Sequence, residues 1–225
     1  MRPVVCEDSL TEGCEALAAA DPDLGRAYRA HGLPPLRYRP PTYDTLLRII
    51  VAQQVSVASA NAIWNRLQAR LDAVETEVTP RAFLTLGEDD LRTVGFSRQK
   101  TAYGQAIAED LVGKRVDLGA VEAMEDETAI AELVKLKGIG RWSAECFLLF
   151  SYGRPDVWPA DDVGLMIGME KIKGLRKRPD AKRMRKLAEA WRPWRGVAAR
   201  LLWHVRKLDV VPADRKEGAA YAKER

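Results

Sequence analysis

A glycine turn between two helical segments constrains the fold of this chain more than any other feature. The segment LVKLKGIGRWSA spans residues 133–144. Within it, Gly138 and Gly140 flank a single apolar residue, Ile139. Glycine adopts backbone conformations that are closed to other residues, so one helix can end here and a second can begin at once. Residues 142–151, WSAECFLLFS, are nearly all apolar and predict a buried central helix. The pattern is that of a helix-hairpin-helix.

The rest of the chain also has the pattern of helices joined by short loops. Period-two alternation of apolar residues is almost absent, so the sequence predicts an all-α protein. Helices are expected over 42–71 with a polar break at Gln53, Gln54 and Ser56, over 81–86, 88–94, 98–112 and 127–136, from 163 onward, and on both sides of Arg192 and Pro193. Ser97 and Asp126 are the expected N-caps of the fourth and fifth of these segments.

The proline-rich loop LPPLRYRPP, residues 33–41, is the best linker in the sequence. We therefore expect two helical domains. The first is a contiguous bundle over 42–153 that ends in the hairpin. The second combines residues 1–41 with residues 154–225.

Composition limits the class of protein. The three cysteines, Cys6, Cys14 and Cys146, have neither zinc-type nor disulfide-type spacing, which favours a reducing compartment. No run approaches the roughly 20 apolar residues of a membrane helix. The first ten residues also lack the apolar core of a signal peptide. We expect a soluble, cytoplasmic protein that does not bind membranes.

Basic residues are concentrated in one segment, although the formal net charge of the chain is only +4. Nine Lys and Arg residues lie between 171 and 186, and Glu170 and Asp180 are the acids beside them. Such a segment can bind phosphates. A solvated helix face has the same composition, so both interpretations stay open.

The hairpin glycines also suit phosphate binding. Because Gly138 and Gly140 lack side chains, a phosphate can approach the N–H groups at the start of the second helix. A turn of this kind holds the DNA backbone without reading its sequence. A tight helix–helix turn with glycine caps would look the same, so the glycines alone do not decide between the two.

An acidic pair follows the hairpin. In VWPADDVGL, Asp161 and Asp162 stand immediately before a new apolar helix. One Asp in such a place is explained as an N-cap. Two in a row leave a second carboxylate that is available for chemistry.

Five motifs, in order, resemble the helix-hairpin-helix DNA glycosylases, most closely the DNA-3-methyladenine glycosylase II branch. They are IIVAQQVSVASA (49–60), LRTVGFSRQKTAYGQAIA (91–108), LVKLKGIGRWSA (133–144), DVWPADDVGL (156–165) and AWRPWRGVAARLLWHV (190–205). The resemblance runs from about residue 42 to residue 205. It implies two helical domains flanking a DNA-binding cleft and an enzyme of base excision repair, which flips a damaged base out of double-stranded DNA.

The resemblance also implies site residues. Asp162 matches the family's catalytic aspartate, and Asp161 is then its neighbour, as an N-cap or a modulator of its charge. The residues implied to line the base pocket are Trp142, Trp203, Cys146 and Asp161. Cys146 departs from the pattern, because members with the best-known pockets have an aromatic residue there, which leaves the substrate range open.

Residues implied to bind DNA lie in the hairpin and in two earlier motifs. They are Gly138, Ile139, Gly140, Arg141, Ser143, Gln53, Gln54 and Ser97. Gln54 fits best the position of the wedge that fills the gap left by the flipped base, although polar residues at a helix end also bond the backbone. The family's hairpin binds a monovalent cation, Na⁺ or K⁺, through backbone carbonyls that correspond to Val134, Leu136 and Gly138.

The resemblance further implies a monofunctional enzyme. Relatives that also nick the strand carry a lysine where this chain has Trp142, so water is the expected nucleophile. The four-cysteine iron–sulfur motif of other relatives is missing, and no cofactor is expected to be required. The expected activity is removal of alkylated purines by a monomer. Deaminated or etheno purines, or DNA binding without catalysis, are the alternatives.

Overall fold

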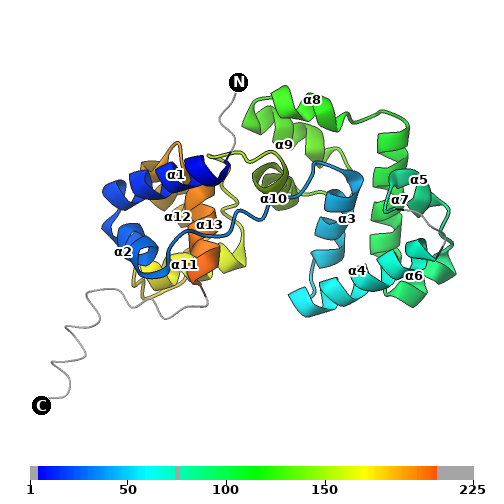
Figure 1. The fold of residues 1–225 in the computed structure, drawn as a ribbon, viewed down its shortest axis with the longest axis horizontal. Coiled ribbons are helices and arrows are strands. Elements are labelled where there is room, and N and C mark those ends of the chain that lie inside the picture. Colours follow the sequence, from blue (N-terminus) through cyan, green and yellow to red (C-terminus); the bar gives the residue numbers. More distant parts are fainter. Residues whose placement is uncertain (1–4, 74–76, 207–225) are drawn as a thin grey trace, which may run out of the picture. The chain divides into compact units, whose positions relative to one another are not determined.

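The computed structural model describes residues 5–73 and 77–206, and the regular elements in this part of the chain are all helical (Figure 1). The prediction of an all-α protein is confirmed. The chain divides into two compact units, Arg39–Tyr152 and Met1–Tyr38 with Gly153–Arg225. The domain boundaries expected from the sequence, 41/42 and 153/154, differ from these divisions by three residues or fewer.

Residues 39–152 contain the hairpin and most of the predicted helices. The helices are α3 (Tyr43–Ala52), α4 (Val57–Asp72), α5 (Pro80–Leu84), α6 (Glu88–Val94), α7 (Arg98–Val112), α8 (Leu118–Ala123), α9 (Asp126–Val134) and α10 (Arg141–Ser151). Helix α10 packs against α9 and α3. Its residues Ser143–Leu149 are all buried, as the apolar sequence predicts.

Several of these helices have a serine or threonine as their N-cap. The Oγ of Ser56 accepts the N–H of Ser59 at 3.1 Å, and Thr79 and Ser97 cap α5 and α7 in the same way. Each cap of this kind stabilises a helix by about 1 kcal/mol. Asp126 was expected to be the N-cap of α9, but it is the first residue of that helix. The preceding residue, Glu125, occupies the N-cap position.

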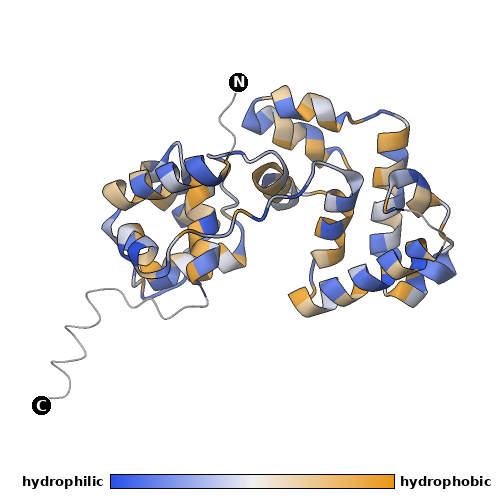
Figure 2. Ribbon diagram, in the orientation of Figure 1, coloured by the Kyte–Doolittle hydropathy of each residue, from blue (hydrophilic) through white to orange (hydrophobic). Residues whose placement is uncertain are grey.

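The second unit is built around α13 (Arg195–Val205), in which eight of eleven residues are buried. Helices α1 (Glu7–Ala20), α2 (Pro22–His31) and α11 (Val163–Ile172) pack on it. Helix α12 (Ala181–Ala188) and the 3-10 turn η1 (Glu189–Trp191) complete this unit. Hydrophobic and hydrophilic residues both occur along most helices (Figure 2). Among the described helices, none combines the length and the hydropathy of a membrane-spanning segment.

A buried carboxylate ties three of these elements together. Asp21 caps α2, and its side chain accepts Lys173 Nζ at 2.6 Å and Trp191 Nε1 at 2.8 Å. Burial raises the pKa of Asp21, but the hydrogen bonds from Lys173 and Trp191 outweigh it, so the pKa lies below its ordinary value. Because Lys173 follows α11 directly, the contact anchors the end of α11 to the start of α2.

Candidate active site

The turn of the hairpin depends on Gly138. Its φ is +90°, in the region that favours glycine, and a Cβ atom there would overlap the ring of Tyr103. Gly140 is different, because its φ is −86° and a Cβ atom would meet nothing within 4 Å. Gly140 is the N-cap of α10 and supplies no side-chain cap. An anion can therefore come close to the first N–H groups of α10.

Two hairpin residues that the sequence suggested for DNA binding have buried side chains. Ile139 is 3% exposed, and so is Ser143. The Oγ of Ser143 lies 3.3 Å from the amide nitrogen of Gln53. At both positions only the backbone is suited to contact a phosphate.

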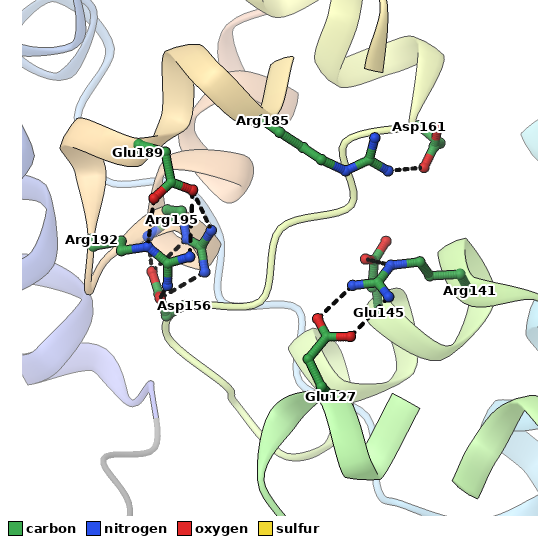
Figure 3. A network of polar contacts seen from close by, with 9 residues as sticks. All are labelled: Glu127, Arg141, Glu145, Asp156, Asp161, Arg185, Glu189, Arg192 and Arg195. Carbon is green, nitrogen blue, oxygen red and sulfur yellow. Dashed lines mark hydrogen bonds and ion pairs between the residues drawn. The ribbon is translucent and has the colours of Figure 1, made fainter. Parts of the chain in front are cut away.

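Arg141, the basic residue among the hairpin candidates, is already paired with two carboxylates. Its guanidinium donates two hydrogen bonds to Glu127, at 2.6 and 2.9 Å, and one to Glu145 at 2.9 Å (Figure 3). The hydrogen bonds to Glu127, together with the charges of both acids, raise the pKa of Arg141. The i,i+4 spacing of Arg141 and Glu145 indicates this pair in the sequence. The pairing of Arg141 with Glu127, 14 residues away, has no such sequence signal.

The two glutamines at the break between α3 and α4 differ in exposure and in contacts. Gln53 is half-buried, and its Nε2 donates to the carbonyl of Gly138 at 3.0 Å. Gln54 is exposed, with a φ of +57° that is uncommon for a residue with a side chain. Of the two, Gln54 is therefore the one with an exposed side chain.

Lys100 supports the loop between α3 and α4, a role that was not predicted from the sequence. Its Nζ donates to the carbonyl of Val51, in the last turn of α3, at 2.8 Å. Burial lowers the pKa of Lys100. A lysine in a helical segment gives no sequence signal of its contact with the Val51 carbonyl.

Ser97, a predicted DNA contact, is exposed and its Oγ caps α7 by accepting the N–H of Lys100 at 3.2 Å.

The carbonyls implied to bind a cation lie at and after the end of α9, where helical carbonyls lack partners within the helix. The Leu136 carbonyl accepts the N–H of Ile139 at 3.0 Å, and that of Gly138 accepts Gln53. A carbonyl oxygen has two lone pairs, so each can still accept a second partner. The donor set therefore fits Na⁺ or K⁺, which prefer oxygen ligands.

Asp162 is held by two hydrogen bonds to one of its oxygens. It is the N-cap of α11, and its Oδ1 accepts the N–H of Leu165 at 2.7 Å. The same oxygen accepts the indole Nε1 of Trp203, on α13, at 2.9 Å. Both donors and the positive end of α11 interact favourably with a negative charge. The half-buried carboxylate is thus oriented by two elements of the same unit.

The loop before Asp162 is attached at both ends. Asp156 accepts hydrogen bonds from Arg192 and Arg195, which also contact Glu189 (Figure 3). At the other end, the carboxylate of Asp161 accepts Arg185 at 2.8 Å. Asp161 was expected as the N-cap of α11 or as a modulator of charge. The N-cap is Asp162 instead, because it directly precedes the first helical residue, Val163.

The remaining pocket candidates lie on α10. Trp142 is half-buried and Cys146 is 6% exposed. Residues four apart on a helix share one face, so the indole and the thiol lie along the same side of α10. Both belong to the unit 39–152, whereas Asp162 and Trp203 belong to the other unit.

Five of the nine basic residues between 171 and 186 are exposed and make no ion pair within the described part of the chain. They are Arg176, Lys177, Lys182, Arg183 and Lys186. The other four have partners: Lys171 contacts the carbonyl of Arg206, Lys173 contacts Asp21 and Asp23, Arg178 contacts Glu170, and Arg185 contacts Asp161. Three of the five lie on α12.

Comparison with known proteins agrees with the hairpin and the acidic loop. A family model described as HhH-GPD superfamily base excision DNA repair protein matches residues 47–193. DNA-3-methyladenine glycosylase 1 of Schizosaccharomyces pombe is 34% identical over 167 residues, which cover 74% of this chain and 73% of that protein. The alkylbase DNA glycosidase-like protein mag2 of the same yeast is 30% identical over 167 residues, which cover 74% and 78%.

Solved structures give the same result. A 3-methyladenine DNA glycosylase of Schizosaccharomyces pombe in complex with abasic DNA has a TM-score of 0.80 at 30% identity, covering 88% of this chain and 98% of that chain. A DNA-3-methyladenine glycosidase of Bacillus halodurans has a TM-score of 0.75 at 31% identity, covering 87% and 89%.

Proposed function

Because the chain belongs to the HhH-GPD superfamily of base excision DNA repair proteins, we propose that it is a DNA glycosylase that removes alkylated purines. The observation that carries the proposal is the carboxylate of Asp162, oriented by Leu165 and Trp203 at the start of α11. The names of the relatives support the substrate class. Double-stranded DNA that contains a damaged base is the proposed substrate, and a monomer in the cytoplasm the proposed form.

The proposed reaction uses the charge of Asp162. An alkylated purine such as 3-methyladenine carries a positive charge, so its glycosidic bond is weakened and the base leaves readily. As the bond breaks, positive charge develops on the sugar. A fixed carboxylate stabilises that charge and can orient the water that attacks the anomeric carbon. Because Asp162 is already oriented by two donors, it need not reorganise during the reaction.

We propose that the reaction stops at the abasic site. Strand nicking by an amine needs a lysine that forms a Schiff base. By the family resemblance, that position is Trp142, whose indole has no nucleophilic amine. The indole instead suits stacking on a cationic base, a contact of about 1 to 3 kcal/mol.

The hairpin is proposed to hold the DNA backbone near the lesion. The N–H groups that follow Gly140 would bind a phosphate, and a Na⁺ or K⁺ ion on the carbonyls of Val134, Leu136 and Gly138 would add positive charge beside it. No iron–sulfur cluster or other cofactor is part of the proposal.

Deaminated or etheno purines form the second candidate substrate class. The observation that favours them is Cys146, a small side chain on the same face of α10 as Trp142. By the family resemblance an aromatic residue would narrow the pocket at this position. A roomier pocket would accept a larger base.

The test is base release from several lesions. Wild-type protein is incubated with methylated, deaminated and etheno-containing duplexes, and the free bases are identified by mass spectrometry. Asp162→Asn keeps the shape of the side chain and both acceptor contacts but removes its charge. It should lower release by about 10² to 10³-fold while binding to duplex DNA is retained.

Asp161→Asn is the matched control. It removes a neighbouring charge that, within the described residues, forms an exposed ion pair with Arg185, with both side chains 49% exposed. Release should stay within about twofold of wild type, because exposed ion pairs contribute little. Unchanged release by Asp162→Asn would reject the catalytic assignment. Release of deaminated or etheno bases alone would favour the second substrate class, and DNA binding with no release would leave a non-catalytic module.

A further inference from the structure

The loop between α3 and α4 is joined to the hairpin by one side chain. Gln53 Nε2 lies 3.0 Å from the carbonyl oxygen of Gly138 and 3.3 Å from Ser143 Oγ. A backbone carbonyl is an acceptor only, so the amide must turn its NH₂ group towards it. The contact links residues 85 apart in sequence within a single unit.

The hairpin end of this contact is closely packed. Gly138 lies against the ring of Tyr103 with a positive φ, and the next residue, Ile139, is 3% exposed. Ser143 is also buried, in the first turn of α10. The acceptors of Gln53 are therefore fixed by the packing of the hairpin.

The loop end holds an unusual backbone conformation. Gln54 is exposed with a φ of +57°. Residues with side chains keep such a conformation only where their surroundings hold it in place. Before it, Lys100 fixes the Val51 carbonyl and Gln53 is fixed by the hairpin. After it, Ser56 caps α4.

We propose that Gln53 is a positioning residue that couples the hairpin to Gln54. Through its amide, Gln53 holds Gln54 in the conformation from which it fills the gap left by a flipped base. The proposal rests on the proposed function, because base flipping is a step of that reaction. Gln53 itself touches neither the sugar nor the base.

The first test replaces the amide without changing the length of the side chain. Gln53→Met removes both donors, and Gln53→Glu places a carboxylate against the carbonyl of Gly138. A duplex with 2-aminopurine beside the lesion reports flipping as a rise in fluorescence. Each variant should lower the flipping equilibrium roughly tenfold, the effect expected for loss of one partly buried hydrogen bond. Affinity for an undamaged duplex should change less than about threefold, because the hairpin that binds phosphate is retained.

The decisive test is the double variant. Gln54→Ala should reduce flipping, and Gln53→Met with Gln54→Ala should be no worse than Gln54→Ala alone, since Gln53 acts through Gln54. A purely structural role of Gln53 would instead give additive losses. Additive losses, or wild-type flipping by Gln53→Met, would overturn the proposal.

Gln99→Met is the matched control. Gln99 also donates its amide to a neighbour, the hydroxyl of Tyr103, at 2.8 Å, and Tyr103 lies under Gly138. The contact does not reach the α3–α4 loop, so flipping should stay at the wild-type level. Wild-type protein that neither flips nor releases a base would count against the proposed function. Wild-type activity that is indifferent to Gln53 would count against the coupling alone.

Discussion

The indole nitrogen of Trp203 donates a hydrogen bond of 2.9 Å to Oδ1 of Asp162. Asp162 stands at the start of α11, and Trp203 lies in the last turn of α13. The backbone N–H of Leu165 donates to the same oxygen. Oδ1 of the carboxylate is therefore oriented by a backbone donor, which most substitutions retain, and by a side-chain donor, which a substitution can remove.

Trp203→Phe tests the side-chain donor. The substitution keeps an aromatic ring for packing and stacking but removes the N–H. Hydrogen bonds to charged groups contribute about 1.5 to 3 kcal/mol. Since Leu165 still holds the oxygen, the single-turnover rate of base release should fall by about tenfold, the lower end of that range. In an Asp162→Asn background the same change should have little further effect, and an unaltered rate in the otherwise wild-type protein would contradict the assignment.

Substitutions at the two hairpin glycines should have different effects, one on protein stability and the other on DNA binding. Gly138→Ala forces a side chain into a φ of +90° and into the ring of Tyr103, so it should destabilise the protein by about 1 to 3 kcal/mol. Gly140→Ala meets nothing within 4 Å and has an ordinary φ, so the melting temperature should change little. Its methyl group would instead crowd a phosphate at the start of α10.

Thermal melting and DNA affinity measure these two effects. A protein of this size loses about 2 to 4 °C of Tm per kcal/mol. We expect a lower Tm with Gly138→Ala and weaker duplex binding at normal Tm with Gly140→Ala. Full binding by a folded Gly140→Ala variant would contradict phosphate binding at this turn.

The sequence allowed the fold class, the hairpin and the break at Gln53 and Gln54 to be predicted, because these depend on local periodicity and on glycine. It did not show the partners of Arg141 or the orientation of Gln53. Those contacts join residues 14 and 85 positions apart, and only the folded chain brings them together. Residues 1–41 were assigned to a helical domain, but the bounds of α1 and α2 within them were not predicted.

The acidic pair shows the same limit. Local pattern predicted one N-cap and one spare carboxylate. In the structure Asp162 is the N-cap and Trp203 donates to the same oxygen, while Asp161 pairs with Arg185. Capping and the proposed chemistry thus fall on one residue, and only the register of α11 decides which one.

Asp21 should make stability depend on pH. Its folded-state pKa lies below the ordinary value because the hydrogen bonds from Lys173 and Trp191 outweigh burial. The folded chain therefore binds this proton less readily than the unfolded chain does. The stabilisation is present above the unfolded pKa of about 3.9 and is lost as pH falls through the folded pKa. Asp21→Asn should lower the free energy of unfolding by about 2 kcal/mol at pH 7.

Urea unfolding of both proteins at pH 7 and pH 3 checks this linkage. The difference in free energy between wild type and Asp21→Asn should shrink at pH 3, where Asp21 of the wild type begins to be protonated. Asp89→Asn is the control, because Asp89 is 90% exposed in its pair with Arg92 and should show no measurable change. A difference that stays constant from pH 7 to pH 3 would show that Asp21 does not titrate as proposed.

Helix α12 should contribute to DNA binding through charge alone. Lys182, Arg183 and Lys186 are exposed and lie on one short helix. Each phosphate contact that is lost reduces the slope of log K against log salt by about 0.9. Replacing all three with Gln should therefore weaken binding at low salt and reduce the slope by up to about 2.7, equally for damaged and undamaged duplexes. Arg92→Gln, whose charge is already paired with Asp89, is the control and should leave the slope unchanged. An unaltered slope in the triple variant would make α12 a solvated face, because counterions are released only where basic side chains neutralise phosphates.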